Sequence, residues 1–374
     1  MTHPAQRSQM TLIPREEVQT PGTTVKIVPA TPVPATSVKS QRIAALDFTK
    51  GALVLIMVLY HWLNYFYGPQ SEIYRYLRFL TPSFIFITGF LISSVYLSKY
   101  GVENPRLPGR LIQRGLKILG VFVVLNVIRI LFLPQSSQRQ LIAEHSSLRS
   151  LADIYLIGTN LGGGQGKAIA FYVLVPIGYL LVLSALLLVG ARFYPYFFHA
   201  VFIFSLLCVL ALDLNGTSSA NLQLLTIGLL GVILGYIPID KINSFVKHPY
   251  IVVAAYLCYV AAITVWNVIY PLQIAGVCLS LMILYLVGDT GGEQGSVRSV
   301  VILLGQYSLL GYIAQIAVLQ VLHQGLKHTS LGEGAALAVS FFSAVALTIL
   351  IVEATHRVRR KVGSVDRLYR AVFA

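Results

Sequence analysis

A histidine lies deep inside the first apolar stretch of the chain, LDFTKGALVLIMVLYHWLNYF, residues 46–66. Histidine can accept and return a proton near neutral pH, which suits it to general acid–base catalysis. His61 follows Lys50 at a spacing that corresponds to about 16 Å along a helix and to about 20° more than three full turns. Lys50 and His61 therefore share one helix face, which Asn64 and Tyr65 continue.

An ionisable ring in a membrane helix is costly, so a functional role is the first hypothesis for His61. The structural alternative is a neutral imidazole that hydrogen-bonds a neighbouring helix. A base at this depth could serve an enzyme, or it could relay protons in a transporter. Asp47, near the start of the same helix, could pair with Lys50, but it lies too far along the axis to orient His61 directly.

The composition indicates which elements hold this histidine. Of the 374 residues, 56% are hydrophobic and 11% are charged, whereas soluble domains carry roughly 25% charged residues. Backbone groups in lipid must be satisfied within their own segment, so the apolar segments are expected to be helices. We predict an all-α fold, a polytopic membrane helical bundle with about ten transmembrane helices. The predicted spans are 51–67, 77–97, 113–133, 168–189, 194–213, 221–238, 250–269, 271–288, 299–322 and 333–354.

The distribution of Lys and Arg predicts the orientation of the bundle. With ten spans both termini lie on one side, which collects 21 of the 28 basic residues, against 6 on the other side. The positive-inside rule then puts both termini in the cytoplasm. The net charge of +14 is thus mostly a signature of topology, and no nucleic-acid partner is expected.

The chain divides into three segments. Residues 1–40 are rich in Pro, Thr and Ser and are predicted to form a disordered cytoplasmic tail. Residues 41–356 form the transmembrane domain, and residues 357–374 form a basic cytoplasmic C-terminal tail. No metal site or disulfide framework is expected, because the three cysteines fall in separate spans: Cys208, Cys258 and Cys278.

Four stretches resemble motifs of the integral-membrane acyltransferase superfamily, which includes acyltransferase-3, glucan succinyltransferase and heparan-alpha-glucosaminide N-acetyltransferase-like proteins. RIAALDFTKGALVLIMVLYH resembles the first-helix pattern, in which an LDxxRG motif precedes a catalytic histidine. PSFIFITGFLIS resembles the second-helix pattern, RLIQRGLKIL the basic start of the third helix, and LLGQYSLLGYIAQI a late helix. The resemblance spans about residues 42–133 and 299–360 in the family's order.

The resemblance implies transfer of an acyl group, such as acetyl or succinyl, from cytoplasmic acyl-CoA to a carbohydrate hydroxyl or amine of the cell envelope. It identifies His61 as the catalytic residue, which would act as general base. It also implies a multi-pass protein of a bacterial-type inner membrane, with acyl-CoA as donor, a carbohydrate or glycolipid as acceptor, and no metal. The alternative is a proton-coupled transporter, or a glycan or lipid flippase, without covalent chemistry.

Three basic residues share a face at the start of the third span: Arg110, Arg114 and Lys117. Such a cluster, together with Lys50, would suit the phosphates of CoA. The alternative is that these side chains are ordinary positive-inside anchors. The resemblance favours donor binding.

The sequence also differs from the family pattern. Lys50 stands where the family usually has Arg, which keeps the charge but loses the planar fork. Gln315 stands where many members have a second histidine, and it forms with Tyr312 the pair of the late helix that we expect nearest the site. The stretch AIAFYVLVPIGY, residues 168–179, lacks the Trp-Ser-x-Ser-x-Glu signature of the acyltransferase-3 branch.

One long segment is predicted on the outer side, residues 134–167, and it carries Glu144, His145 and Asp153. Long ordered loops often bind ligands. We therefore expect these three residues to be candidates for acceptor binding, with disorder of the segment as the alternative.

Overall fold

The structure is a computed structural model. It describes residues 43–68, 72–131, 153–158, 171–194, 196–246, 248–266, 268–290, 295–326 and 332–373. Within these residues every regular element is a helix, so the predicted all-α fold is confirmed. The predicted N-terminal tail, residues 1–40, lies outside the described residues.

Among the described residues, eight helices are long and apolar enough to cross a membrane. They are α1 (Ala44–Phe66), the compound helix Tyr74–Tyr100, α5 (Arg106–Leu131), α8 (Leu174–Ala191), α9 (Phe197–Leu214), α13 (Tyr270–Thr290), α15 (Ser308–Leu326) and α16 (Glu333–Lys361). Two shorter apolar helices, α10 (Ala220–Leu234) and α12 (Pro249–Val265), occupy the other two predicted spans.

Several helices are short or irregular. The compound helix consists of α2 (Tyr74–Leu77), α3 (Leu80–Leu91), a π-helical stretch η1 (Ile92–Leu97) and α4 (Ser98–Tyr100). A second π-helical stretch, η2 (Asp153–Ile157), packs against α10. The other short helices are α11 (Ile239–Val246), α14 (Ser296–Gln306) and α17 (Gly363–Phe373).

The structure corrects three predicted boundaries. The predicted span 299–322 is two helices, because the chain leaves helical geometry at Tyr307, between α14 and α15. Within the described part of the predicted span 168–189, which begins at Phe171, the α-helix α8 starts at Leu174. The boundary between the predicted spans 250–269 and 271–288 lies earlier, because α12 ends at Val265 and α13 already begins at Tyr270.

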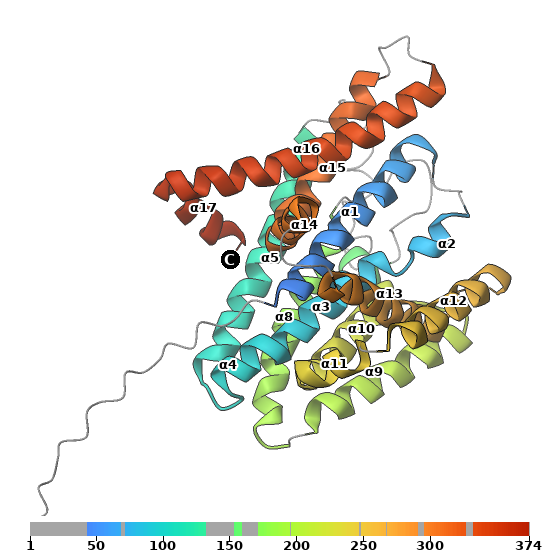
Figure 1. Cartoon of the computed structure of the whole chain (residues 1–374). Coiled ribbons are helices and arrows are strands. Elements are labelled where there is room, and N and C mark those ends of the chain that lie inside the picture. The colour runs from blue at the N-terminus through green and yellow to red at the C-terminus, as the bar shows by residue number, and fades with distance from the viewer. Residues whose placement is uncertain are drawn as a thin grey trace, which may run out of the picture. The chain divides into compact units, whose positions relative to one another are not determined.

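Most of the predicted basic C-terminal tail, residues 357–374, is helical. α16 continues to Lys361, and α17 begins two residues later at Gly363. Figure 1 shows α17 turning back from the end of α16 toward α5, and α17 contacts both helices.

Helix α1 lies in the middle of the bundle and contacts α3, α13, α14, α15 and α16 (Figure 1). It crosses α14 with the two backbones in contact at Gly51 and Gly305. A Cβ atom at Gly51 would overlap the Val301 carbonyl, and one at Gly305 would overlap the Asp47 carbonyl. Small residues permit such close crossings in membrane bundles. These two motif glycines therefore fix the start of α1 against α14.

A close contact at glycine residues also joins α3 to α10. A Cβ atom at Gly89 would overlap the carbonyl of Gly228. Ser93, further along the same compound helix, donates a hydrogen bond of 2.6 Å to the Val232 carbonyl of α10. The stretch PSFIFITGFLIS is thus packed through its glycine and its last serine.

We call the end of the bundle that holds Lys50, Arg114 and the C-terminal helix α17 the basic end.

Candidate active site

A cavity of about 210 Å³ lies at the basic end, among α1, α3, α5, α8, α15 and α17. None of the described residues that line it is acidic. Its polar and tyrosine lining residues are Lys50, Thr88, Tyr96, Arg114, Gln306, Ser308, Tyr312 and Tyr369. We call it the basic cavity. It brings together Lys50, Arg114 and Tyr312, three of the residues that the sequence singled out.

Lys50 is held in the wall of this cavity by Asp47. Its Nζ lies 2.5 Å from Oδ1 of Asp47, and the two side chains are only 17% and 11% exposed. The ion pair expected from the sequence is therefore present. The crossing of α1 and α14 fixes both residues, because Gly305 packs on the Asp47 backbone.

Arg114 is the member of the predicted basic trio that lines the cavity. Its guanidinium donates a hydrogen bond to the Tyr96 hydroxyl and lies over the Tyr96 ring. Arg110 lies instead over Tyr100, with its guanidinium carbon 4.9 Å from the ring centroid. Lys117 is half-buried and is not among the lining residues. The three side chains thus do not converge on one point.

The break between α14 and α15 faces the same cavity. Gly305, Gln306 and Ser308 line it, and Ser308 is the first residue of α15. The first turn of a helix leaves backbone N–H groups without intrahelical partners, and the helix dipole favours negative charge there. Together with Lys50 and Arg114, this helix start makes the cavity suited to an anionic group.

Tyr312 links the cavity to His61. The Tyr312 ring lines the cavity, and its centroid lies 6.1 Å from that of the His61 imidazole. On another side Tyr312 meets Phe171, at 6.0 Å between centroids. Phe171 adopts a left-handed backbone conformation with φ of 61°, which is strained for a bulky residue. A strained backbone of this kind is kept only where packing holds the residue in place. For Phe171, which lies just before α8, the contact with Tyr312 is part of that packing.

Gln315, on the same helix as Tyr312, is completely buried. Neither its amide nitrogen nor its amide oxygen has a hydrogen-bond partner among the described residues. Leaving a buried polar group unsatisfied costs roughly 1–3 kcal/mol. A native amide of this kind therefore calls for an explanation such as a bound molecule or water.

The other two residues of the predicted His61 face do not reach the cavity. Asn64 donates a hydrogen bond of 3.1 Å to the carbonyl of Tyr60 on its own helix. The ring of Tyr65 packs 5.8 Å from that of His323, near the end of α15. Tyr65 also interacts electrostatically with Arg129 of α5. These residues belong to the end of the bundle opposite the basic end.

Of the predicted acceptor residues, Glu144 and His145 lie outside the described part of the chain. Asp153 begins η2, and its backbone carbonyl accepts a hydrogen bond of 2.6 Å from Gly158. The segment is fastened to α10, because the Asn221 amide donates to the carbonyl of Tyr155.

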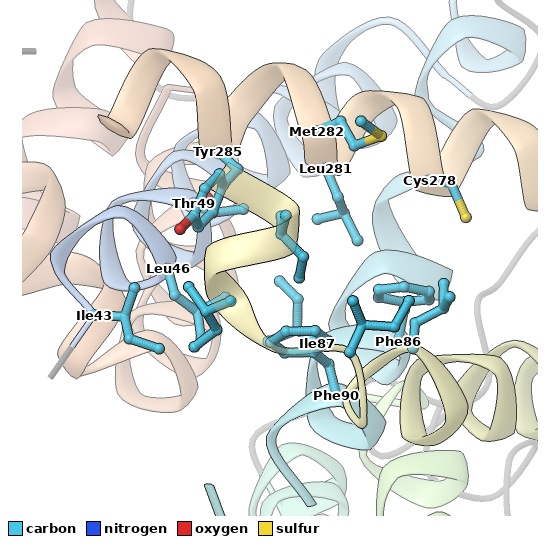
Figure 2. Close-up of a pocket in the computed structure, with 14 residues that line it drawn as sticks. Ile43, Leu46, Thr49, Phe86, Ile87, Phe90, Cys278, Leu281, Met282 and Tyr285 are labelled. Carbon is cyan, nitrogen blue, oxygen red and sulfur yellow. The ribbon is translucent and has the colours of Figure 1, made fainter. Parts of the chain in front are cut away.

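A larger cavity of about 300 Å³ lies on another side of α1 and α3 (Figure 2). The labelled side chains from α1, α3 and α13 converge on it and are nearly all hydrocarbon. Its two hydroxyl groups bond within the protein, since Thr49 donates to the Ala45 carbonyl and Tyr285 to Asn243. None of the described residues that line it is charged, so the basic cavity is the candidate active site.

Two residues of the site, Tyr369 and Phe373, come from α17 and are not among the site residues predicted from the sequence. The signal was present, because apolar residues of α17 recur at helical spacing: Val365, Tyr369, Val372 and Phe373. Within the described residues no group of three possible metal ligands occurs.

The helical bundle thus holds His61 beside a basic cavity that is suited to an anionic group. The chain matches the acyltransferase-3 family model, described as an acyltransferase domain, over residues 43–353. The match covers most of the chain, so this protein belongs to that family of membrane acyltransferases. Neither the curated proteins nor the solved structures contain a significant match.

Proposed function

We propose that this membrane acyltransferase moves an acetyl or succinyl group from cytoplasmic acyl-CoA to a hydroxyl or amine of a cell-envelope carbohydrate, with His61 as general base. One observation carries the proposal. Tyr312 both lines the basic cavity and packs against His61. A donor whose phosphates lie near Lys50 and Arg114 therefore has a short path to the imidazole.

The chemistry needs one proton acceptor and one leaving group. The His61 imidazole takes the proton of the acceptor hydroxyl while its oxygen attacks the thioester carbonyl. The C–S bond then breaks, and the imidazolium returns the proton to the departing thiolate. The products are the acylated carbohydrate and CoA with a free thiol. Base assistance of this kind contributes typically about 10²–10⁴-fold in rate.

The donor would enter from the basic end. Lys50 and Arg114 supply positive charge there, and the start of α15 adds backbone N–H groups. With the basic end in the cytoplasm, as the positive-inside rule favours, the cavity opens to the compartment that contains acyl-CoA. The acceptor would approach His61 from the opposite end, where Tyr65 and Arg129 offer hydrogen-bonding groups.

The direct test is transfer of a labelled acyl group. Purified wild-type protein would receive radiolabelled acetyl-CoA or succinyl-CoA together with cell-envelope glycans. We expect label in the glycan, and a loss of about 10²-fold or more in His61→Ala. His199→Ala is the matched control, because His199 lies in α9 and does not line the cavity. Undiminished transfer by His61→Ala would remove His61 from the mechanism.

Family membership favours this enzyme over the transporter or flippase alternatives. The same assay separates them. A transporter would move the glycan or protons without label reaching the glycan, and its activity would not require acyl-CoA.

A further inference from the structure

The C-terminal helix α17 forms part of the wall of the basic cavity. Tyr369 and Phe373, one turn apart, line the cavity together with Arg114. The match to the acyltransferase family ends at residue 353, so α17 lies beyond the matched region. α17 also contacts α5, the helix that carries Arg114.

Arg359, near the end of α16, fastens α17 in this position. Its guanidinium donates two hydrogen bonds to Oδ1 of Asp366, at 3.0 and 2.6 Å. The guanidinium carbon lies 3.8 Å from the centroid of the Tyr369 ring. A third hydrogen bond of 3.0 Å goes to the hydroxyl of Tyr307. Arg359 therefore joins α17 to the break between α14 and α15.

The charges that hold α17 to Arg359 do not change near neutral pH. Hydrogen bonding from Arg359 holds the pKa of Asp366 below its usual value of 3.8. A carboxylate with a lowered pKa contributes its stabilisation above the ordinary pKa and loses it only as the pH falls through the lowered one. Burial raises the pKa of Tyr369 to about 12. Both groups thus keep one charge state throughout the neutral range.

The basic cavity is too small to enclose the whole donor. A volume of about 210 Å³ is smaller than the roughly 300–1,000 Å³ of sites that bury a drug-sized ligand. Acyl-CoA is larger than such a ligand, since it carries a nucleotide as well as a pantetheine arm. Only part of the donor fits inside, so the nucleotide must extend beyond the cavity, past a part of the wall that reaches the protein surface. α17 is such a part, because it carries the lining residues Tyr369 and Phe373 next to the exposed residues Arg367, Leu368 and Arg370.

We infer that α17 is part of the donor site, with Tyr369 and Phe373 contacting the nucleotide end of acyl-CoA and Arg359 acting as the positioning residue that holds them there. This inference rests on the proposed function. Aromatic rings are suited to the contact because every nucleobase presents a flat face for stacking. Two exposed arginines, Arg367 and Arg370, add positive charge to α17, and Arg370 also pairs with Asp366.

The test measures binding of two probes to the full-length protein: coenzyme A, and pantetheine, which lacks the nucleotide. We expect Arg359→Gln and Phe373→Ala each to raise the dissociation constant of coenzyme A by about 10-fold. The affinity for pantetheine should stay unchanged. A merely structural role for Arg359 would instead weaken both probes together and would overturn the inference.

The matched control is Arg357→Gln. Arg357 also lies on α16 and also pairs with a carboxylate, at 2.5 Å from Glu353, but it does not contact α17. Its substitution should leave the affinity for coenzyme A within about twofold. Phe373 takes no part in the hydrogen bonds between Arg359 and Asp366, so Phe373→Ala tests the aromatic contact even if Arg359→Gln lowers the stability of the protein.

Three results would count against the inference. Unchanged coenzyme A affinity in both variants, with affinity still lost in Arg114→Ala, would overturn the role of α17 and leave the proposed function standing. Tighter binding in the variants would show that α17 obstructs the site. If the wild type bound no coenzyme A at all, the proposed function would fall and the inference with it.

Discussion

At the scale of single residues, the basic cavity separates two arginines that look equivalent in the sequence. Arg110 and Arg114 lie one turn apart on α5, yet Arg114 lines the cavity and Arg110 lies over Tyr100. Hydrogen bonds to charged groups contribute roughly 1.5–3 kcal/mol. We therefore expect Arg114→Ala to weaken donor binding by about 10-fold or more, measured by calorimetry with coenzyme A.

Arg110→Ala is the control for this measurement. It removes the same charge from the same helix but no group from the cavity lining, so the loss should be about twofold or less. Equal losses in the two variants would indicate a diffuse electrostatic effect of the basic end and would contradict a specific role for Arg114.

Gln315 gives a second prediction at this scale. Its buried amide lacks hydrogen-bond partners among the described residues, so Gln315→Leu should preserve or raise stability, by up to about 1 kcal/mol. If the amide serves the reaction, transfer should still fall by about 10-fold or more. Thermal unfolding and the labelled transfer assay measure the two effects. A variant that loses stability and keeps its activity would show that Gln315 only supports packing.

Contacts within one helix of the site can be predicted from the sequence, whereas contacts between helices cannot. The pairing of Asp47 with Lys50 was predictable, because helical periodicity alone brings the two side chains together. The different positions of the Arg110 and Arg114 side chains were not predictable from the sequence. They depend on contacts with Tyr100 and Tyr96, which lie on another helix. Asn64 likewise shares the predicted face but turns back to its own backbone.

At the scale of elements, the crossing of α1 and α14 fixes the wall of the cavity. Gly305 packs on the backbone of Asp47 with no room for a side chain. Overpacking a tight contact costs typically about 1–3 kcal/mol. We expect Gly305→Ala to lower the thermal stability of the purified protein and to weaken coenzyme A binding, since Lys50 would move with α1.

Gly325→Ala is the matched control for this crossing. A Cβ atom at Gly325 in α15 would meet no neighbour, and alanine favours helix over glycine by about 0.5–1 kcal/mol. That variant should be as stable as the wild type or slightly more stable. Equal destabilisation by both substitutions would mean that the close crossing is not the cause.

The predicted elements were right where apolar length alone decides, as for the long helices α1, α5 and α13. They were wrong at Tyr307, because the short polar run Gln306-Tyr307-Ser308 contains no proline and does not by itself predict the end of a helix. The break depends on tertiary contacts that hold the Tyr307 side chain, including a 3.1 Å hydrogen bond between its hydroxyl and His356. The docking of α17 depends on the same cluster, which is why a basic C-terminal segment could be predicted but its position at the cavity could not.

At the scale of the whole molecule, the orientation in the membrane decides which compartment supplies the donor. The positive-inside rule predicts that the connection between α9 and α10 lies outside and that between α4 and α5 lies inside. With the native cysteines replaced, a single cysteine at Ser218 should react with an impermeant reagent in intact cells, and one at Glu103 should react only after lysis. The reverse pattern would contradict a cytoplasmic donor.

The proposed mechanism requires that a donor held at the basic cavity directs its thioester toward His61. The most direct measurement is an experimental structure of the protein with coenzyme A bound. We expect the phosphates beside Arg114 and Lys50, the nucleotide against α17, and the sulfur directed past Tyr312 toward the imidazole. Coenzyme A bound elsewhere, or bound in the cavity with its sulfur pointing away from His61, would contradict the proposed mechanism.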